Sequence, residues 1–125
     1  MVLVDSSSWT QALRVKGDPA VRSRVMQLVA SGQAVWCDMV RLELWNGARG
    51  TDERKRLGEF DRELIRLPID QQVWETACEI SRVVRDAGLT VPNPDLVIFA
   101  CAQTHDVPLD HCDQHFDKLH KMITR

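Results

Sequence analysis

Four acidic residues of this chain stand where solubility alone does not explain a charge. Asp5 directly follows the short apolar run VLV, and Asp113 comes a few residues after the apolar run VPL. Glu43 and Asp95 fall beside the apolar faces of two helical patterns instead of opposite them. If the fold brings these carboxylates together, a divalent cation such as Mg²⁺ or Mn²⁺ is their natural partner, because hard cations prefer oxygen ligands.

A cation held by carboxylates can activate water for hydrolysis. It lowers the pKa of a bound water, orients that water in line with a phosphodiester and offsets charge on the leaving oxygen, and two ions about 4 Å apart can share these tasks. Bound cations also let a chain with a formal net charge of -2 hold a phosphate backbone. The pattern therefore predicts metal-dependent phosphodiester hydrolysis, with Asp5, Glu43, Asp95 and Asp113 as metal ligands and catalytic residues.

Each carboxylate also has a simpler explanation. Asp5 and Asp113 could cap helices, Asp95 could favour a helix dipole, and Glu43 could pair with Arg49. Four such explanations at once are harder to accept, because a parallel α/β topology would gather the four at one end of the sheet. Repulsion among them then costs stability unless a cation lies between them.

The elements that must position these residues alternate along the chain. Short apolar runs at 2–4, 34–36, 65–69 and 107–109 read as strands, and longer helical patterns separate them. This alternation predicts one three-layer α/β/α domain over residues 1–125, with a mostly parallel central sheet. Asp5 and Asp113 then lie beyond the carboxyl ends of strands, where α/β proteins place their ligand sites.

Several helix boundaries can be read from the sequence. Asn93 is a candidate N-cap with Pro94 as the first helical residue, and Asp38 is a candidate N-cap of a helix that Gly47 or Gly50 ends. The clearest amphipathic pattern is a stripe of apolar residues at helical spacing: Val73, Ala77, Ile80 and Val84.

Composition limits the class of protein. The chain has 125 residues, 44% hydrophobic and 27% charged, as in ordinary globular proteins. No segment reaches the roughly 18 apolar residues that cross a membrane, and the opening residues reach an aspartate before the apolar core of a signal peptide can develop. The four cysteines include no CxxC pair, so we expect a reducing cytoplasmic setting, with Cys78 and Cys101 buried on helices.

Other chemistries fit less well. The four histidines lie near the end of the chain, but the spacing of His111, Cys112 and His115 does not match structural zinc sites, so a solvated or RNA-facing surface is expected. No GxSxG motif supports a serine nucleophile. A phosphatase of the haloacid-dehalogenase kind needs an aspartate where Ser7 stands, and a receiver-type signalling module lacks its acidic pair. A catalytically inactive interaction domain remains the main alternative.

The order and separation of these motifs resemble the PIN-domain ribonucleases, in particular the VapC-type toxins of bacterial type II toxin–antitoxin pairs, over essentially the whole chain. VLVDSSSW resembles the family's opening strand and first metal-binding aspartate, followed by a hydroxyl residue, here Ser6, that supports the site. RLELWNG resembles the family's glutamate with a glycine four residues later. NPDLVIFACAQTHDVPL and HCDQHFDKL resemble the two remaining aspartate motifs, those of Asp95 and Asp113.

The chain departs from the family pattern at two places. A second acidic residue often follows two positions after the one matched to Asp113, and here that position is His115. Asp117 lies four positions after Asp113, so it ranks below the other four as a metal ligand. A basic residue is frequent where Cys112 stands.

The resemblance implies a Mg²⁺- or Mn²⁺-dependent endoribonuclease that cuts a tRNA or rRNA loop and inhibits translation. It also implies a cognate VapB-type antitoxin whose disordered tail folds onto the toxin, DNA binding only through that antitoxin, a homodimer and no membrane association. Two further sets of residues are open to either of two roles. The first set could contact phosphate or form a solvated helix end; it consists of Arg41, Arg49, Arg54, Lys55 and Arg56. The second set could lie in the core, which is favoured, or at an interface; it consists of Trp9, Trp45 and Trp74.

Overall fold

The computed structural model describes residues 1–123, and its centre is a sheet of four parallel strands. The strands are β1 (Val2–Val4), β2 (Ala34–Cys37), β3 (Ile65–Leu67) and β4 (Leu109–Asp110). Their order is β3-β2-β1-β4, and Leu3 of β1 is in register with Val35 on one side and Leu109 on the other. The α/β class and the parallel sheet predicted from sequence are confirmed.

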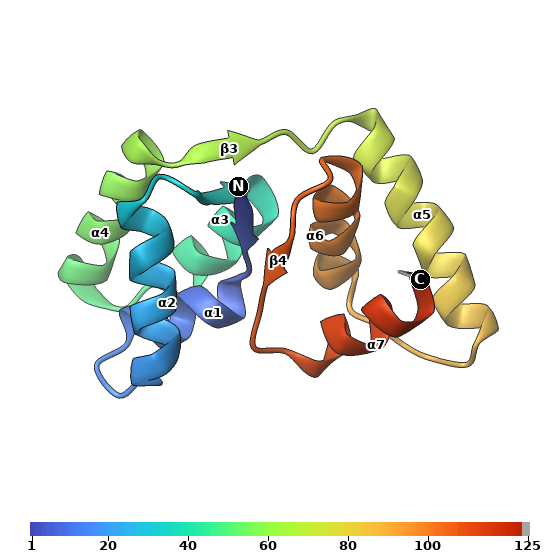
Figure 1. Ribbon diagram of the computed structural model, residues 1–125, viewed down its shortest axis with the longest axis horizontal. Coiled ribbons are helices and arrows are strands. Elements are labelled where there is room, and N and C mark those ends of the chain that lie inside the picture. Colours follow the sequence, from blue (N-terminus) through green and yellow to red (C-terminus); the bar gives the residue numbers. More distant parts are fainter. Residues whose placement is uncertain (124–125) are drawn as a thin grey trace.

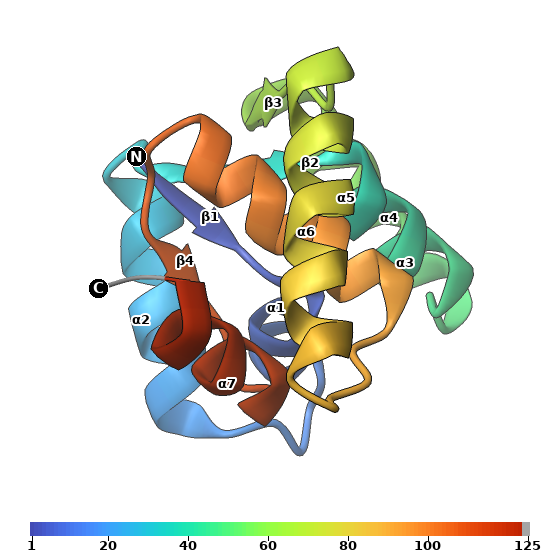
Figure 2. The same ribbon diagram turned by 90° about the vertical axis from the view of Figure 1, so that its right-hand side faces the viewer.

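Helices cover both faces of this sheet and complete three layers. They are α1 (Ser6–Leu13), α2 (Pro19–Ala30), α3 (Asp38–Asn46), α4 (Gly50–Glu63), α5 (Gln71–Asp86), α6 (Asn93–Thr104) and α7 (Gln114–Ile123). Figures 1 and 2 show α5, α6 and α7 on one side of the sheet and α2 and α4 on the other. The short α3 packs against both α1 and α6, so it bridges the layers near the carboxyl ends of the strands.

Two groups of buried apolar residues hold the layers together. Trp9 and Trp36 are fully buried and surround Phe60, whose ring centroid lies 4.9 Å from that of Trp9. On the other face, α6 is buried over every residue from 96 to 102, because it lies between the sheet, α5 and α7. Burying each large apolar side chain contributes about 1.5–3 kcal/mol.

The amphipathic stripe on α5 is confirmed, and it explains two wrong expectations. All four residues of the stripe are buried. Cys78 and Trp74 each follow a stripe residue directly, about 100° around the helix, and both are exposed instead of buried. Cys101 and Trp9 are buried as expected, and Trp45 is partly buried.

Other element boundaries differ by one or two residues from the sequence expectation. The third strand ends at Leu67, and the last strand is Leu109–Asp110 instead of 107–109. Asp38 is the first residue of α3 and not its cap, since Cys37 takes the N-cap position, and the Asp38 carboxylate pairs with Arg41. Pro92 takes the N-cap position before α6, so Asn93 is already helical, whereas Gly47 ends α3 as predicted.

Within residues 1–123, no helix has both the length and the apolar character that spanning a bilayer requires.

Candidate functional site

Asp5 lies at the junction of β1 and α1. Its backbone N–H donates to the carbonyl of Asp110, which continues the β1–β4 pairing, and its carboxylate caps α1. Asp5 Oδ2 accepts hydrogen bonds from the Ser7 N–H at 2.9 Å and the Ser7 hydroxyl at 2.6 Å. Only 3% of Asp5 is exposed. Burial raises the pKa of the Asp5 carboxyl above its ordinary value, and the two Ser7 hydrogen bonds act against this rise.

Glu43 reaches the same region from α3. Its Oε1 accepts a hydrogen bond of 2.9 Å from the hydroxyl of Ser6, the first residue of α1. Ser6 therefore contacts one of the four proposed ligands. Burial raises the pKa of Glu43, and the negative charges of Asp5, Asp95 and Asp113 raise it further, against the effect of the Ser6 hydrogen bond.

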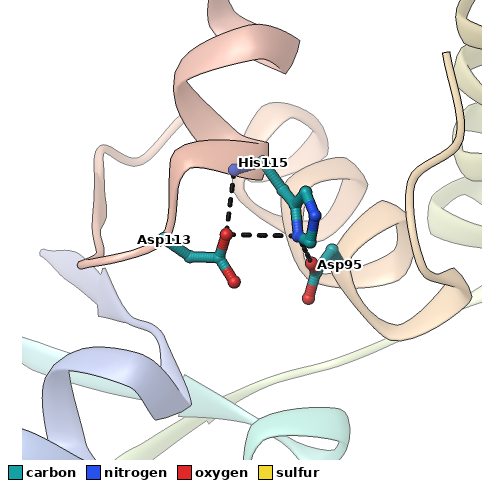
Figure 3. A group of neighbouring side chains, drawn as sticks. All are labelled: Asp95, Asp113 and His115. Carbon is teal, nitrogen blue, oxygen red and sulfur yellow. Dashed lines mark hydrogen bonds and ion pairs between the residues drawn. The ribbon is translucent and has the colours of Figure 1, made fainter.

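Asp95 and Asp113 both contact the same ring nitrogen of His115 (Figure 3). Asp95 lies in the first turn of α6, and Asp113 immediately precedes α7. His115 Nδ1 is 2.9 Å from Asp95 Oδ2 and 3.1 Å from Asp113 Oδ1, and the His115 N–H donates to the same Asp113 oxygen at 2.8 Å. One ligand atom from each of these three residues lies within 4.8 Å of the other two.

The four carboxylates influence one another electrostatically. After burial, the charges of Asp113 and Asp5 raise the pKa of Asp95, although its hydrogen bond with His115 lowers it. The charges of Asp5, Asp95 and Asp113 also raise the pKa of Glu43, so the four carboxylates share one region of the fold. Within residues 1–123, the group of ligand atoms within 4.8 Å of one another takes in Asp95, Asp113 and His115, but not Asp5 or Glu43.

No arginine or lysine neutralises this region within residues 1–123. Arg24 pairs with Asp110, and Arg41 pairs with Asp61 and Asp38; the ion pairs of Asp95 and Asp113 are with His115 only. An oxygen-rich cluster with one imidazole and no arginine or lysine partner suits a divalent cation, which would offset the repulsion that adds to the effect of burial on these pKa values. The residues present thus fit the metal that the sequence motifs imply.

Asp117 takes no part in this cluster. Its side chain is 68% exposed, and its Oδ1 lies 3.7 Å from His111 Nε2. His111 also packs its ring 5.1 Å from that of Phe116. Among the described residues, the group of ligand atoms that could hold an ion takes in His115 but neither His111 nor Cys112.

The structure adds functional candidates that sequence reasoning missed. His115 was expected on a solvated or RNA-facing surface, yet it lies between two of the carboxylates; its position two residues after Asp113 was the available signal. Asp110, which falls at the end of β4, accepts hydrogen bonds from Ser8 Oγ at 2.7 Å and Arg24 Nε at 2.7 Å. Burial alone would raise the pKa of Asp110, but these partners lower it overall. Both carboxylate oxygens of Asp110 accept hydrogen bonds from Ser8 or Arg24, so Asp110 links the end of β4 to α1 and α2 and is not proposed as a metal ligand.

Two of the basic residues that could contact phosphate already contact other side chains. Arg41 Nε lies 2.6 Å from Asp61 Oδ1, and the Arg41 guanidinium also covers the Trp36 ring. Arg56 lies over the Phe60 ring. These contacts favour structural roles for the two arginines.

Comparisons with known proteins cover nearly all of this chain. A family model described as PIN domain matches residues 2–122. Ribonuclease VapC21 of Mycobacterium tuberculosis is 34% identical over 110 residues, which cover 86% of this chain and 79% of that protein. Ribonuclease VapC11 of the same species is 29% identical over 122 residues, which cover 95% of this chain and 91% of that protein.

The fold also matches solved structures. The crystal structure of VapBC2 from Rickettsia felis bound to a DNA fragment from their promoter gives a TM-score of 0.77 at 17% identity, over 94% of this chain and 92% of the matched chain. At this identity the match concerns the fold alone. The family match, however, spans all four clustered carboxylates and every element that carries them.

Proposed function

This chain belongs to the PIN domain family, and from that premise we propose that it is a metal-dependent endoribonuclease toxin of a toxin–antitoxin pair. The observation that carries the proposal is the cluster of Asp5, Glu43, Asp95 and Asp113, which has no arginine or lysine partner within residues 1–123. The names of the two curated relatives support the ribonuclease activity. In this proposal residues 1–125 form one PIN-like domain that cleaves a tRNA or rRNA loop and so inhibits translation in the cytoplasm.

The four carboxylates have the role of holding the cation. Asp5, Glu43, Asp95 and Asp113 would bind one or two Mg²⁺ or Mn²⁺ ions, and Ser6 would hold Glu43 toward them through its 2.9 Å hydrogen bond. The bound ion supplies positive charge for the phosphodiester and acidifies the attacking water. Asp5 is buried and Asp95 is half-buried, which restricts the movement of both side chains and would help them to hold the cation in a fixed position.

Single-stranded loops are suitable substrates for such a site. Bases in loops are unstacked and their backbone can bend toward a protein groove, whereas duplex RNA hides its base edges. A small cavity of about 40 Å³ lies next to Glu43 between α1, α3 and α4, lined by residues that include Thr10, Arg14 and Ala48. Bound cations would counter the repulsion between the carboxylates and the phosphates of the strand.

The same proposal names two protein partners. A VapB-type antitoxin would cover the acidic site with a segment that folds on binding, and DNA binding would belong to the antitoxin. Support comes from the structural similarity to the toxin–antitoxin complex of Rickettsia felis, which was solved on promoter DNA. A homodimer is also part of the proposal.

An RNA cleavage assay tests the enzymatic part. Purified protein is incubated with total tRNA or with ribosomes in Mg²⁺ or Mn²⁺, with and without EDTA, and cuts are mapped. We expect discrete fragments that disappear with EDTA and with Asp5→Asn but persist with Asp86→Asn, a matched change of an exposed aspartate at the end of α5. Absence of cleavage on both RNAs by protein that binds metal would instead support a catalytically inactive PIN-like interaction domain.

The partner assignments have separate tests. Titration with the cognate antitoxin should abolish cleavage at a stoichiometric ratio, and cleavage that persists in excess antitoxin would contradict the inhibitory role. Light scattering after gel filtration should give twice the chain mass of 14.3 kDa, whereas a monomeric mass at the assay concentration would contradict the homodimer.

A further inference from the structure

We propose that His115 is a direct ligand of the cation held by Asp95 and Asp113, and that its nitrogen shifts the preference of the site from Mg²⁺ toward Mn²⁺. This inference rests on the proposed function, since it takes the carboxylate cluster to be a metal centre. It goes further by assigning a ligand that is not one of the four carboxylates and by choosing between the two ions.

The position of one ring nitrogen carries the argument. His115 Nδ1 is 2.9 Å from Asp95 Oδ2 and 3.1 Å from Asp113 Oδ1. A ring nitrogen has either one hydrogen or one lone pair, so it cannot make a full hydrogen bond to both oxygens at once. A cation among these three atoms would contact all of them, and their mutual separations of at most 4.8 Å leave room for a common ligand sphere.

Local backbone geometry fixes this arrangement. The His115 N–H donates to Asp113 Oδ1 at 2.8 Å at the start of α7, so the same carboxylate that meets the imidazole also binds its backbone. The side chain of Asp95 is 13% exposed, and those of Asp113 and His115 are 33% and 35% exposed. The three groups are therefore held in place but open to a cation from solvent.

The other histidines do not compete for this role. His111 lies next to Asp117 and Phe116, and His105 bonds its Nε2 to the Pro68 carbonyl at 2.8 Å. His105 follows the carboxyl end of α6, whereas Asp95 lies in its first turn. Of the histidines in residues 1–123, only His115 joins a group that could hold an ion.

The choice of metal follows from ligand chemistry. Mg²⁺ demands oxygen ligands in a near-octahedral arrangement and gives up water reluctantly. First-row transition ions accept imidazole nitrogen more readily, so exchanging one carboxylate of an all-oxygen site for a histidine lowers affinity for Mg²⁺ more than for Mn²⁺. A site with His115 as ligand should therefore discriminate between the ions more strongly than its His115→Asp variant.

Electron paramagnetic resonance on bound Mn²⁺ tests the ligand directly, without any RNA. We expect ¹⁴N hyperfine coupling in the wild-type protein, replaced by ¹⁵N coupling when the protein is labelled with ¹⁵N-histidine. The coupling should vanish in His115→Asp and His115→Gln and persist in His105→Gln. Circular dichroism confirms that each variant is folded. Mn²⁺ bound without nitrogen coupling, or coupling that survives in both His115 variants, would overturn the proposal.

Calorimetric titration with Mn²⁺ and with Mg²⁺ tests the selectivity. The dissociation constant for Mg²⁺ divided by that for Mn²⁺ should fall from wild type to His115→Asp, because a third carboxylate favours Mg²⁺ more than an imidazole does. An unchanged ratio would overturn the assignment of selectivity to His115. His105→Gln should keep the wild-type ratio.

The outcomes separate this inference from the proposed function. Nitrogen coupling in a protein that cuts neither tRNA nor ribosomal RNA would support the ligand assignment and contradict the nuclease. Metal-dependent RNA cleavage without nitrogen coupling would support the nuclease and contradict the ligand assignment.

Discussion

Replacing Asp5 by asparagine should change stability in opposite directions with and without metal. Asp5 is only 3% exposed, and burial raises its pKa, so its ionised form at pH 7 is disfavoured in the folded protein. The side-chain amide that Asp5→Asn introduces keeps an oxygen for the Ser7 N–H and removes the charge that repels Asp113. Without metal, the free energy of unfolding of Asp5→Asn should therefore equal or exceed that of the wild-type protein.

Metal should reverse the order of the two proteins. A ligand at 100 times its dissociation constant stabilises the folded state by about 2.7 kcal/mol. At about 2.1 cal/mol/K per residue, the chain of 125 residues has an unfolding entropy of about 0.26 kcal/mol/K, so the wild-type Tm should rise by about 10 °C. The rise in Asp5→Asn should be much smaller, because one of four anionic ligands is lost.

Differential scanning calorimetry at pH 7, with EDTA and with saturating Mn²⁺, measures both effects. Asp86→Asn, at the exposed end of α5, is the matched control and should respond to Mn²⁺ as the wild-type protein does. An equal rise of Tm in wild type and Asp5→Asn would refute the reasoning that Asp5 holds the cation. A clearly lower Tm of Asp5→Asn than of the wild-type protein in EDTA would refute the reasoning that the Asp5 charge destabilises the metal-free fold.

Three further outcomes are expected from the contacts around the site. Asp117→Asn should keep most RNA cleavage activity and the wild-type Mn²⁺ affinity, because its side chain is 68% exposed and outside the cluster; a tenfold loss of either would contradict this. Ser8→Ala should lower the free energy of unfolding by about 1–3 kcal/mol in urea denaturation, because Ser8 is fully buried and donates to Asp110 at 2.7 Å. The pKa of Asp61 is lowered, chiefly by its hydrogen bond with Arg41, so this pair contributes stability above the ordinary pKa of 3.8 that is lost as the pH falls through the lower folded pKa. When denaturation is measured between pH 2 and pH 7, the free energy of unfolding should therefore fall less steeply with acid in Arg41→Met than in the wild-type protein. Parallel curves of unfolding free energy against pH for the two proteins would contradict the assignment.

The sequence by itself determined the class of fold and the residues of the acidic cluster. Alternation of short apolar runs with helical patterns requires a covered parallel sheet, because each element must bury its apolar face against another layer. The stripe on α5 fixed which side of that helix is buried for the same reason. Asp5 and Glu43 were recognisable because each interrupts a local apolar pattern, and such a signal is present in the sequence before folding.

The tertiary structure alone decided how those residues meet. Asp95 and His115 are 20 residues apart, and only the packing of α6 against α7 brings the imidazole to 2.9 Å from the carboxylate. No periodicity or spacing encodes that contact, since His115 lies on a polar segment that is equally suited to solvent. Asp110 was likewise hidden, because its partners Ser8 and Arg24 come from α1 and α2. Local patterns reveal which residues must be buried or charged, whereas contacts between distant elements depend on the packing of the whole chain.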